Sequence, residues 1–356
     1  MDKSRTWMRR RNFSASLSTR GFLNSTYTGY KSSTIHRIQE LDLHFNNSEH
    51  EELWPSPLEL TSLQRLRISR YSHLDQVAFH DTPALKHLPL QDLQVRESFQ
   101  NLLSPCSWTT LTSLQVEKCV LVEPRSFVQV LRLTRSLTLL KIAPDARDEP
   151  LQDSLDGHGS LDGENPAYLP HLKSFHLCIE HERPPSILQF VDCCNNESSI
   201  TTLSLLHPYS FSDDQQGFNL HLITLLRKLP YLQRLRLHAP DRDLDLNSVL
   251  LVLAGALGNN EDELDDSLCP RLQELHISFD TDYSQVVSPG SLRALYKSKA
   301  LRRDREVIGG KVFISEGMLG IQEDDPDEED MCWVDDAQQS GLLEYPASES
   351  SWVDIF

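Results

Sequence analysis

The side chains of this sequence that could do chemistry are few, and the most compact group is His176, Cys178 and His181. Imidazole and thiolate groups are typical zinc ligands, and a zinc site needs a fourth donor or an open coordination position. On an extended strand His176 and Cys178 would face the same way, with Leu177 on the opposite side. Because the sequence shows no fourth donor, it favours a surface histidine beside a free cysteine over a metal site.

Other chemical motifs are weak or absent. The segment 156–164 (DGHGSLDGE) is rich in carboxylates, but these are not at alternate positions before a central glycine, and no glutamate closes a twelve-residue calcium loop. The sequence contains no GxxxxGK[ST], GxSxG, HExxH or HxE…PCxxC motif. We therefore predict a protein that is not an enzyme and that holds no cofactor or metal.

The elements that would position binding residues are set by a phrase that recurs nine times, with apolar residues at i, i+3 and i+5. Such a phrase is typical of the strand of a leucine-rich repeat. The nine triplets are Ile38/Leu41/Leu43, Leu63/Leu66/Ile68, Leu85/Leu88/Leu90, Leu111/Leu114/Val116, Leu137/Leu140/Ile142, Leu172/Phe175/Leu177, Ile200/Leu203/Leu205, Leu232/Leu235/Leu237 and Leu272/Leu275/Ile277.

The spacing of these triplets supports a stack of repeats. Their first residues are 25, 22, 26, 26, 35, 28, 32 and 40 residues apart, and one leucine-rich unit has roughly 20–29 residues. One strand and its return segment cannot bury their own apolar face, so each unit must stack on its neighbours. We predict an α/β fold, an irregular leucine-rich-repeat solenoid of about nine repeats, with a curved parallel sheet on the concave face and helices and loops on the convex face.

The return segments are helical where apolar residues follow a 3.6-residue period. This period predicts helices over 124–133 and from residue 184, both of which open with proline. It also predicts helices over 219–229 and 245–257. The position three residues after each triplet holds Asn46 and Cys119 but otherwise neither asparagine nor cysteine. The solenoid should therefore lack a continuous asparagine ladder.

Charge divides the chain into three regions. Residues 1–37 hold eight Lys/Arg and one acid, whereas 316–356 hold thirteen Asp/Glu and no base, within a net charge of −18. We predict a basic N-terminal segment (1–34), the solenoid (35–315) and an acidic disordered tail (316–356). The region between these two segments, residues 38–315, is itself acidic. This argues against a nucleic-acid partner, because nucleic-acid binding needs a basic surface.

The expected compartment is the cytosol or the nucleus. No apolar run approaches the ~20 residues that cross a bilayer, and no apolar core follows the basic N-terminus, so neither a membrane partner nor a secretory signal is expected. Seven cysteines without CxxC pairs indicate reduced thiols. The run Arg9–Arg11 is a nuclear-import signal, a phosphate contact or simply a solvated terminus.

Function is predicted on the concave face, where residues flanking the last two apolar positions of each triplet point outward. Arginine forks at two of these strands suit carboxylate or phosphate partners, but cross-strand pairing of Arg65 and Arg67 with the Glu40/Asp42 row, and of Arg234 and Arg236 with the Glu274 row, explains them equally well. The predicted protein-binding residues are Glu40, Asp42, Arg65, Arg67, Gln115, Glu117, Lys141, His176, Arg234, Arg236, His238, Glu274 and His276.

A family resemblance rests on LPHLKSFHL, LPYLQRLRL, CPRLQELHI, VLRLTRSLTLLKI and SLRALYKSKALRRD, and on the opening TWMRRRNFSASLS. Over about residues 6–315 these phrases resemble the leucine-rich region of F-box proteins of mushroom-forming fungi. The resemblance implies capture of a target protein for a cullin–RING ubiquitin ligase. An F-box is not visible ahead of Trp7, so a Skp adaptor is expected as a partner only if an F-box lies upstream.

The sequence therefore predicts non-catalytic recognition of a target protein by a leucine-rich-repeat arc, as the substrate-recognition part of an F-box ligase or as a free-standing scaffold. Two other functions stay open. The arc could regulate a small GTPase through an exposed arginine. The acidic tail, with the aromatic residues Trp333, Trp352 and Phe356, could make the protein a nuclear cofactor.

Overall fold

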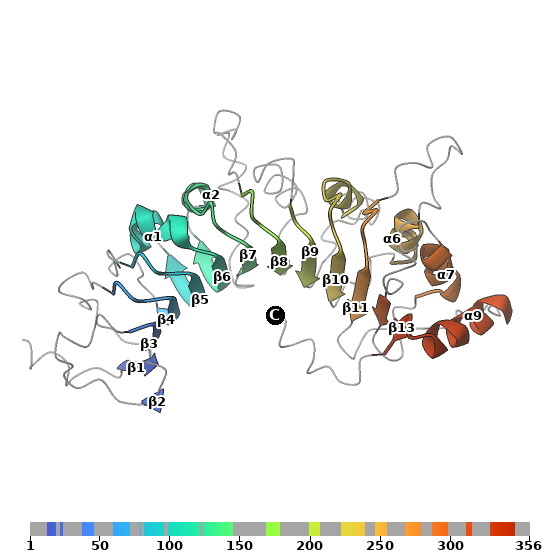
Figure 1. The fold of residues 1–356 in the computed structure, drawn as a ribbon, viewed down its shortest axis with the longest axis horizontal. Helices are drawn as coiled ribbons and strands as arrows, with labels where there is room; N and C mark the ends of the chain where they lie inside the picture. The colour runs from blue at the N-terminus through green and yellow to red at the C-terminus, as the bar shows by residue number, and fades with distance from the viewer. Residues whose placement is uncertain are drawn as a thin grey trace, which may run out of the picture. The chain divides into compact units, whose positions relative to one another are not determined.

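The computed structural model of the chain forms two compact units. Figure 1 labels their helices and strands. Unit 1 comprises Met1–Leu172 with Cys193–Asn195, and unit 2 comprises Lys173–Asp192 with Asn196–Phe356. The structure describes residues 13–18, 22–23, 38–45, 60–71, 79, 82–95, 99–121, 124–144, 169–178, 199–206, 222–238, 246–254, 268–278, 287–297, 311–314 and 328–345.

Unit 1 is a sheet whose strands follow the order β7-β6-β5-β4-β3-β1-β2. Neighbours from β3 to β7 are parallel, whereas β1 is antiparallel to both β2 and β3. Its strands are β1 (Phe13–Ser18), β2 (Phe22–Leu23), β3 (Glu40–Phe45), β4 (Arg65–Tyr71), β5 (His87–Val95), β6 (Ser113–Leu121) and β7 (Leu139–Pro144). Its helices are η5 (Phe99–Leu102), α1 (Pro105–Thr110) and α2 (Pro124–Leu133).

Unit 2 is a parallel sheet with the strand order β13-β12-β11-β10-β9-β8. Its strands are β8 (Ser174–Cys178), β9 (Thr202–Leu206), β10 (Arg234–His238), β11 (Glu274–Ser278), β12 (Lys311–Ile314) and β13 (Leu343–Glu344). Its helices are α6 (Leu246–Leu253), α7 (Pro289–Lys297) and α9 (Glu328–Gln339), together with a helical turn over 222–227. Helix α7 contacts both α6 and α9.

The nine predicted strands are all confirmed as β3 to β11, and the predicted α/β leucine-rich-repeat fold is confirmed in both units. Every residue of the nine triplets is buried except Ile142, which is partly exposed. Helix α2 coincides with the predicted segment 124–133, and α6 lies within 245–257. The helix predicted from residue 184 and the acidic segment 156–164 lie outside the described residues.

Backbone hydrogen bonds set the register between repeats without an asparagine ladder. In unit 1 the amides of Lys86 and His87 both donate to the carbonyl oxygen of Gln64, at 2.9 and 3.0 Å. In unit 2 the amides of Gln273 and Glu274 both donate to the carbonyl of Gln233, at 2.8 and 2.9 Å. Since these donors lie at the start of each strand, they fix which residues of neighbouring strands stand side by side.

The boundary residue of phrases such as LPYLQRLRL closes a tight turn before each strand. The amide of Leu232 donates to the carbonyl of Leu229 at 3.1 Å, and that of Leu272 donates to Cys269 at 2.9 Å. An i to i+3 bond of this kind is typical of a β-turn, in which proline suits the second position. The turn places the first apolar residue of each triplet in the core.

The predicted disordered tail from residue 316 is wrong for residues 328–345. Helix α9 buries Val334 and Ala337, and β13 buries Leu343 while pairing with β12. The Trp333 ring lies 5.8 Å from that of Tyr296 on α7. The dense charge of this segment in the sequence hid these few apolar residues from a composition argument. Unit 2 therefore extends beyond the predicted boundary at 315.

Two further features differ from the expectation. Strands β1 and β2 lie inside the predicted basic N-terminal segment, where β1 covers the edge of β3. Strand β12 carries Val312 and Ile314 in the core without a full triplet before them. No helix among the described residues is long and apolar enough to span a membrane.

Candidate protein-binding face

The candidate site of each unit is its strand face, which we define as the strand positions that alternate with the buried triplet residues. In unit 1 the register places Glu40 beside Arg65 and Asp42 beside Arg67. In unit 2 it forms a first row (Ser174, Thr202, Arg234, Glu274, Lys311) and a second row (His176, Ser204, Arg236, His276, Phe313, Glu344). The predicted site residues therefore lie in continuous rows within each unit.

The arginines of unit 1 do not form the cross-strand ion pairs that the sequence allowed. Arg65, Arg67 and Glu40 are exposed. Arg67 instead donates from Nη2 to Oε1 of Gln91 on β5, at 2.9 Å. Among the described residues neither arginine is within ion-pair distance of a carboxylate, so both guanidinium groups of unit 1 stay open to solvent and to partners.

Two other predicted residues of unit 1, Glu117 and Lys141, form an ion pair with each other. Lys141 Nζ lies 2.8 Å from Oε1 of Glu117 across β6 and β7, and the lysine side chain is only 10% exposed. Gln115 is the register neighbour of Lys141 and is partly exposed. This end of the strand face therefore offers fewer free charges than the arginine end.

His87, an exposed residue beside Arg65 in the same row, was not among the predicted site residues. Partial burial and the positive charge of Arg65 lower the pKa of His87 below its ordinary value. The rule that gave the other site residues also gives His87 when applied to the Leu85/Leu88/Leu90 triplet.

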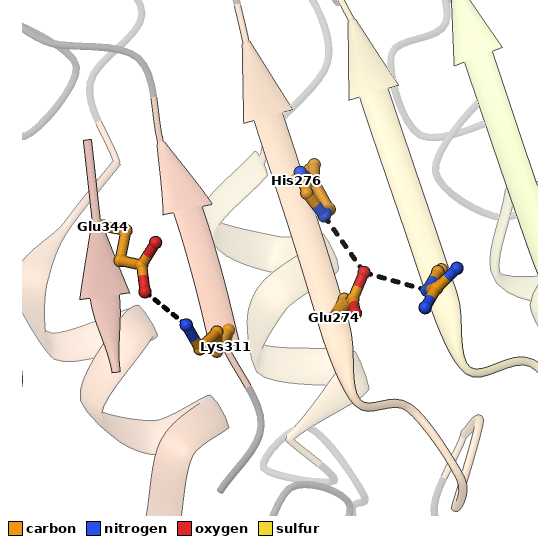
Figure 2. Close-up of polar contacts among 5 residues, drawn as sticks. Glu274, His276, Lys311 and Glu344 are labelled. Carbon is orange, nitrogen blue, oxygen red and sulfur yellow. Dashed lines mark hydrogen bonds and ion pairs between the residues drawn. The ribbon is translucent and has the colours of Figure 1, made fainter. Parts of the chain in front are cut away.

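In unit 2 one carboxylate holds two side chains of the face. Glu274 Oε2 lies 2.9 Å from Nε of Arg234 on β10 and 3.5 Å from Nε2 of His276 on its own strand (Figure 2). The alternative explanation, neutralisation by the Glu274 row, is therefore confirmed for Arg234. It does not extend to the second arginine of the pair.

Arg236 is half-buried, and its Nε atom is buried without a hydrogen-bond partner. Burial lowers the pKa of Arg236, and the charge of Arg234 lowers it further, although Glu274 opposes both effects. The guanidinium stays charged at neutral pH, because an arginine pKa is too high for deprotonation. Burying a charge without a direct partner costs free energy. Arg236 bears this cost, whereas the other described arginines of the two faces, Arg65, Arg67 and Arg234, are exposed.

Two aromatic rings lie beside this arginine. His276, its register neighbour on β11, stacks on Phe313 of β12 with ring centroids 4.2 Å apart and planes at 12°. Burial and the Arg236 charge lower the pKa of His276 to about 4 despite Glu274. The imidazole is therefore neutral at pH 7, and the stacked rings form a flat pair without net charge.

Two further pairs engage polar residues of unit 2. His238 Nδ1 lies 2.5 Å from Oγ of Ser278, and Lys311 Nζ pairs with Oε1 of Glu344 (Figure 2). Lys311, Phe313 and Glu344 were not predicted as site residues because their strands lack the repeated triplet.

The histidine and cysteine cluster is not brought together as a described site. His176 lies on β8 and is 8% exposed, whereas the side chain of Cys178 and all of His181 lie outside the described residues. Within the described ranges, no three His, Cys, Asp or Glu side chains are grouped closely enough to hold a metal ion.

Comparison with known proteins finds similarity among solved structures. No family model and no curated protein matches the sequence. Among solved structures, the chain is similar to the crystal structure of the leucine-rich repeat-containing protein LegL7 from Legionella pneumophila, with 14% identity, 81% of this chain and 84% of that chain covered, and a TM-score of 0.35. The fold assignment therefore rests on the repeated strands themselves.

Proposed function

We propose that this chain is a non-catalytic recognition protein that binds a target protein through its strand faces. The observation that carries the proposal is that Arg65, Arg67 and Arg236, all at outward positions, have no ion-pair partner among the described residues. The core does not use these side chains, and neighbouring carboxylates do not occupy them. Arginine is over-represented at interface hot spots because its planar fork can bind, stack and desolvate at low cost.

The preferred partner is a protein rather than a nucleic acid or a membrane. The chain carries a net charge of −18, and a polyanion would be repelled by such a molecule at long range. A protein ligand presents isolated carboxylates and apolar groups, which match a few separate arginines and the flat His276–Phe313 pair. A compartment with reduced thiols, the cytosol or the nucleus, fits the same proposal.

A finer proposal is that the target is captured for a cullin–RING ubiquitin ligase. It is supported by the resemblance of LPHLKSFHL, LPYLQRLRL and CPRLQELHI to fungal F-box proteins. We expect a Skp adaptor to co-purify with the chain when an F-box is joined to it. Recovery of targets without adaptor and cullin from cells expressing the native transcript would leave a free-standing scaffold.

The proposal of a nuclear cofactor acting through its tail needs a modified test, because residues 328–345 are folded. Deleting 316–356 would damage unit 2 and confuse loss of a tail with loss of the fold. Deleting only 346–356 removes Trp352 and Phe356 and spares β13. Loss of partners from this shorter deletion would favour the tail over the strand faces.

The main experiment compares charge reversals on the two faces with reversals elsewhere. The face variants are Arg65→Glu/Arg67→Glu and Arg234→Glu/Arg236→Glu. The controls are Arg135→Glu in unit 1 and Arg227→Glu in the helical turn of unit 2, both exposed and away from the strands. Each tagged chain is expressed in cells of the organism that encodes the protein, and the captured proteins are quantified by mass spectrometry.

We expect at least one face variant to lose partners that both controls retain, while its circular dichroism and melting temperature stay close to those of the parent. Equal recovery of every partner by both face variants would contradict the proposal and move the site away from the strand faces.

A further inference from the structure

Two buried polar atoms at adjacent positions of unit 2 lack hydrogen-bond partners. They are Oγ of Ser204 on β9 and Nε of Arg236 on β10, and the two residues are direct register neighbours. Ser204 is fully buried and lies between the larger side chains of His176 and Arg236 on the flanking strands. Buried polar groups in native proteins are rarely left unpaired, so a pair of such groups calls for an explanation.

The charge of Arg236 is also uncompensated locally. Of the described arginine and lysine side chains at outward positions of unit 2, Arg234 pairs with Glu274 and Lys311 pairs with Glu344. Arg236 alone has no ion pair, and its neighbour His276 is neutral at pH 7 because its pKa is about 4. The two pairs cancel, so the center of this face keeps one positive charge.

The stacked rings next to Arg236 give this charge an apolar border. His276 and Phe313 continue the same row on the two following strands, and their stacking is visible in the distance of 4.2 Å between centroids. A partner group that reached Arg236 would lose water along this flat surface. Charge-assisted hydrogen bonds are stronger where water is excluded.

We infer that Ser204, Arg236, His276 and Phe313, together called the Arg236 site, bind a side-chain carboxylate of the target protein. The guanidinium of Arg236 donates to the carboxylate oxygens, and the buried hydroxyl of Ser204 donates to the same carboxylate once the flanking Arg236 side chain turns outward. The stacked rings contact the aliphatic part of the aspartate or glutamate. This inference rests on the proposed function, since it names the chemistry that one face of the recognition protein selects.

The charge count favours a carboxylate over a phosphate. A phosphoserine carries −1.5 to −2 charges at pH 7 and usually engages several cationic donors. The Arg236 site has one free cation, and the carboxylate of Glu274 lies on the adjacent strand, bound to Arg234. A dianion would meet repulsion from Glu274 that a monoanion largely escapes.

The test uses peptides of defined sequence selected on the full-length chain. A random peptide library is enriched on the wild-type protein and depleted on the Arg236→Gln variant, and the selected peptides are synthesised. In each peptide the acidic residue is replaced by its amide or by phosphoserine, and a C-terminally amidated copy distinguishes a side-chain carboxylate from a terminal one. Dissociation constants are measured by fluorescence polarisation.

We expect selected peptides to share one aspartate or glutamate. Replacing it with its amide should weaken binding roughly 30-fold or more, the effect expected for breaking a desolvated charge pair. The same replacement should have almost no effect on binding to Arg236→Gln, because the pair is already broken. Arg236→Lys should restore part of the affinity, since it keeps the charge but loses the planar fork.

Ser204→Ala provides a second variant that does not depend on the charge. It should leave the melting temperature unchanged or raised, because it removes an unpaired buried hydroxyl. It should weaken the acidic peptides roughly tenfold or more, the range of one hydrogen bond to a charged group. Unchanged affinity in Ser204→Ala would remove the serine from the site, and a lower melting temperature would show that the hydroxyl is already bonded within the protein.

The outcomes separate this inference from the proposed function. Peptides that bind the strand face of unit 2 without an acidic residue, or that bind phosphoserine more tightly than glutamate, would overturn the carboxylate site and leave protein recognition standing. A library that yields no peptide sensitive to either Arg65→Glu/Arg67→Glu or Arg234→Glu/Arg236→Glu would overturn both.

Discussion

The two Arg-x-Arg strands, RLRI on β4 and RLRL on β10, are almost identical in sequence but differ in environment. On β4 both guanidinium groups are exposed, and Arg67 turns toward Gln91 on the following strand. On β10 the following strand carries Glu274, which takes Arg234 and leaves Arg236 half-buried without a partner. The neighbouring strand, rather than the arginine pair itself, therefore decides which charge is available for recognition.

This difference predicts separate roles for the two pairs. Exposed charges act mainly on the rate of encounter and are screened by salt. A desolvated charge acts mainly on the rate of dissociation, because breaking its contact leaves a buried group unpaired. We expect Arg65 and Arg67 to guide an acidic target toward the protein and Arg236 to hold it.

The largest effect should come from Arg236→Gln. Loss of the buried charge contact is expected to cost about 2–5 kcal/mol of binding free energy, which raises the dissociation constant roughly 30-fold or more. Surface plasmon resonance with the captured target should assign most of this change to the dissociation rate. Arg227→Gln in the helical turn 222–227 is the control with a much smaller effect, since Arg227 is exposed and lies away from the strand face; equal losses in the two variants would contradict the comparison.

The second largest effect concerns the two histidines. The pKa of His276 falls from 6.5 to about 4 on folding, so the unfolded chain takes up its proton first as the pH drops. The contribution of neutral His276 to the free energy of unfolding is fully present above about pH 6.5. It is lost progressively as the pH falls toward 4, by at most about 3 kcal/mol. The pKa of His87 is also lowered, but its exposure limits the effect.

Urea denaturation between pH 7.5 and 4.5 measures this difference. His276→Gln should lose much of the acid destabilisation of the parent, whereas His87→Gln should keep nearly all of it. Parallel pH profiles of the parent and His276→Gln would show that the histidine is not shielded from protonation as described.

A smaller effect is expected from removing the carboxylates next to each pair. Glu274→Gln frees Arg234 and leaves a second positive charge near Arg236, so an acidic target should bind several-fold more tightly. Glu40→Gln on unit 1 should change binding less, because Glu40 forms no ion pair with Arg65 among the described residues. Each replacement should change the free energy of unfolding by less than about 1 kcal/mol, because the Arg234–Glu274 pair is largely open to solvent and Glu40 has no ion-pair partner among the described residues. Weaker target binding by Glu274→Gln would mean that the carboxylate itself contacts the target.

The smallest effect should come from Arg65→Gln/Arg67→Gln. The association rate with an acidic target should fall a few-fold at low ionic strength and recover toward the parental rate near 0.5 M salt, because the Debye length shrinks below roughly 5 Å there. The dissociation rate should change little. A large, salt-independent rise in the dissociation rate would place these arginines inside the interface.

The repeated strands could be predicted from sequence because each triplet buries the same three positions. Ile38 to Ile277 follow one local rule that neighbouring repeats reinforce, so nine matches specify β3 to β11 despite irregular spacing. Strands β12 and β13 depend instead on a sheet edge that the preceding repeats provide. Their two or four residues carry too little pattern to stand out, and α9 was hidden by its exposed acids.

The site could be predicted only as far as the strand pattern reaches. Alternation gave the outward positions, including both arginine pairs, and it allowed cross-strand pairing for all of them. It could not say that Glu274 would choose Arg234 and His276 rather than Arg236, because that choice depends on side-chain conformers. Nor could it identify Ser204, whose significance lies in burial without a partner.

The most direct test of the account is the dissociation rate of the captured target from wild type, Arg236→Gln and Arg65→Gln/Arg67→Gln, measured side by side at low and high salt. The account predicts a roughly 30-fold or larger rise for Arg236→Gln at both salt concentrations and nearly parental dissociation for the double variant. Equal dissociation rates from all three proteins would contradict it.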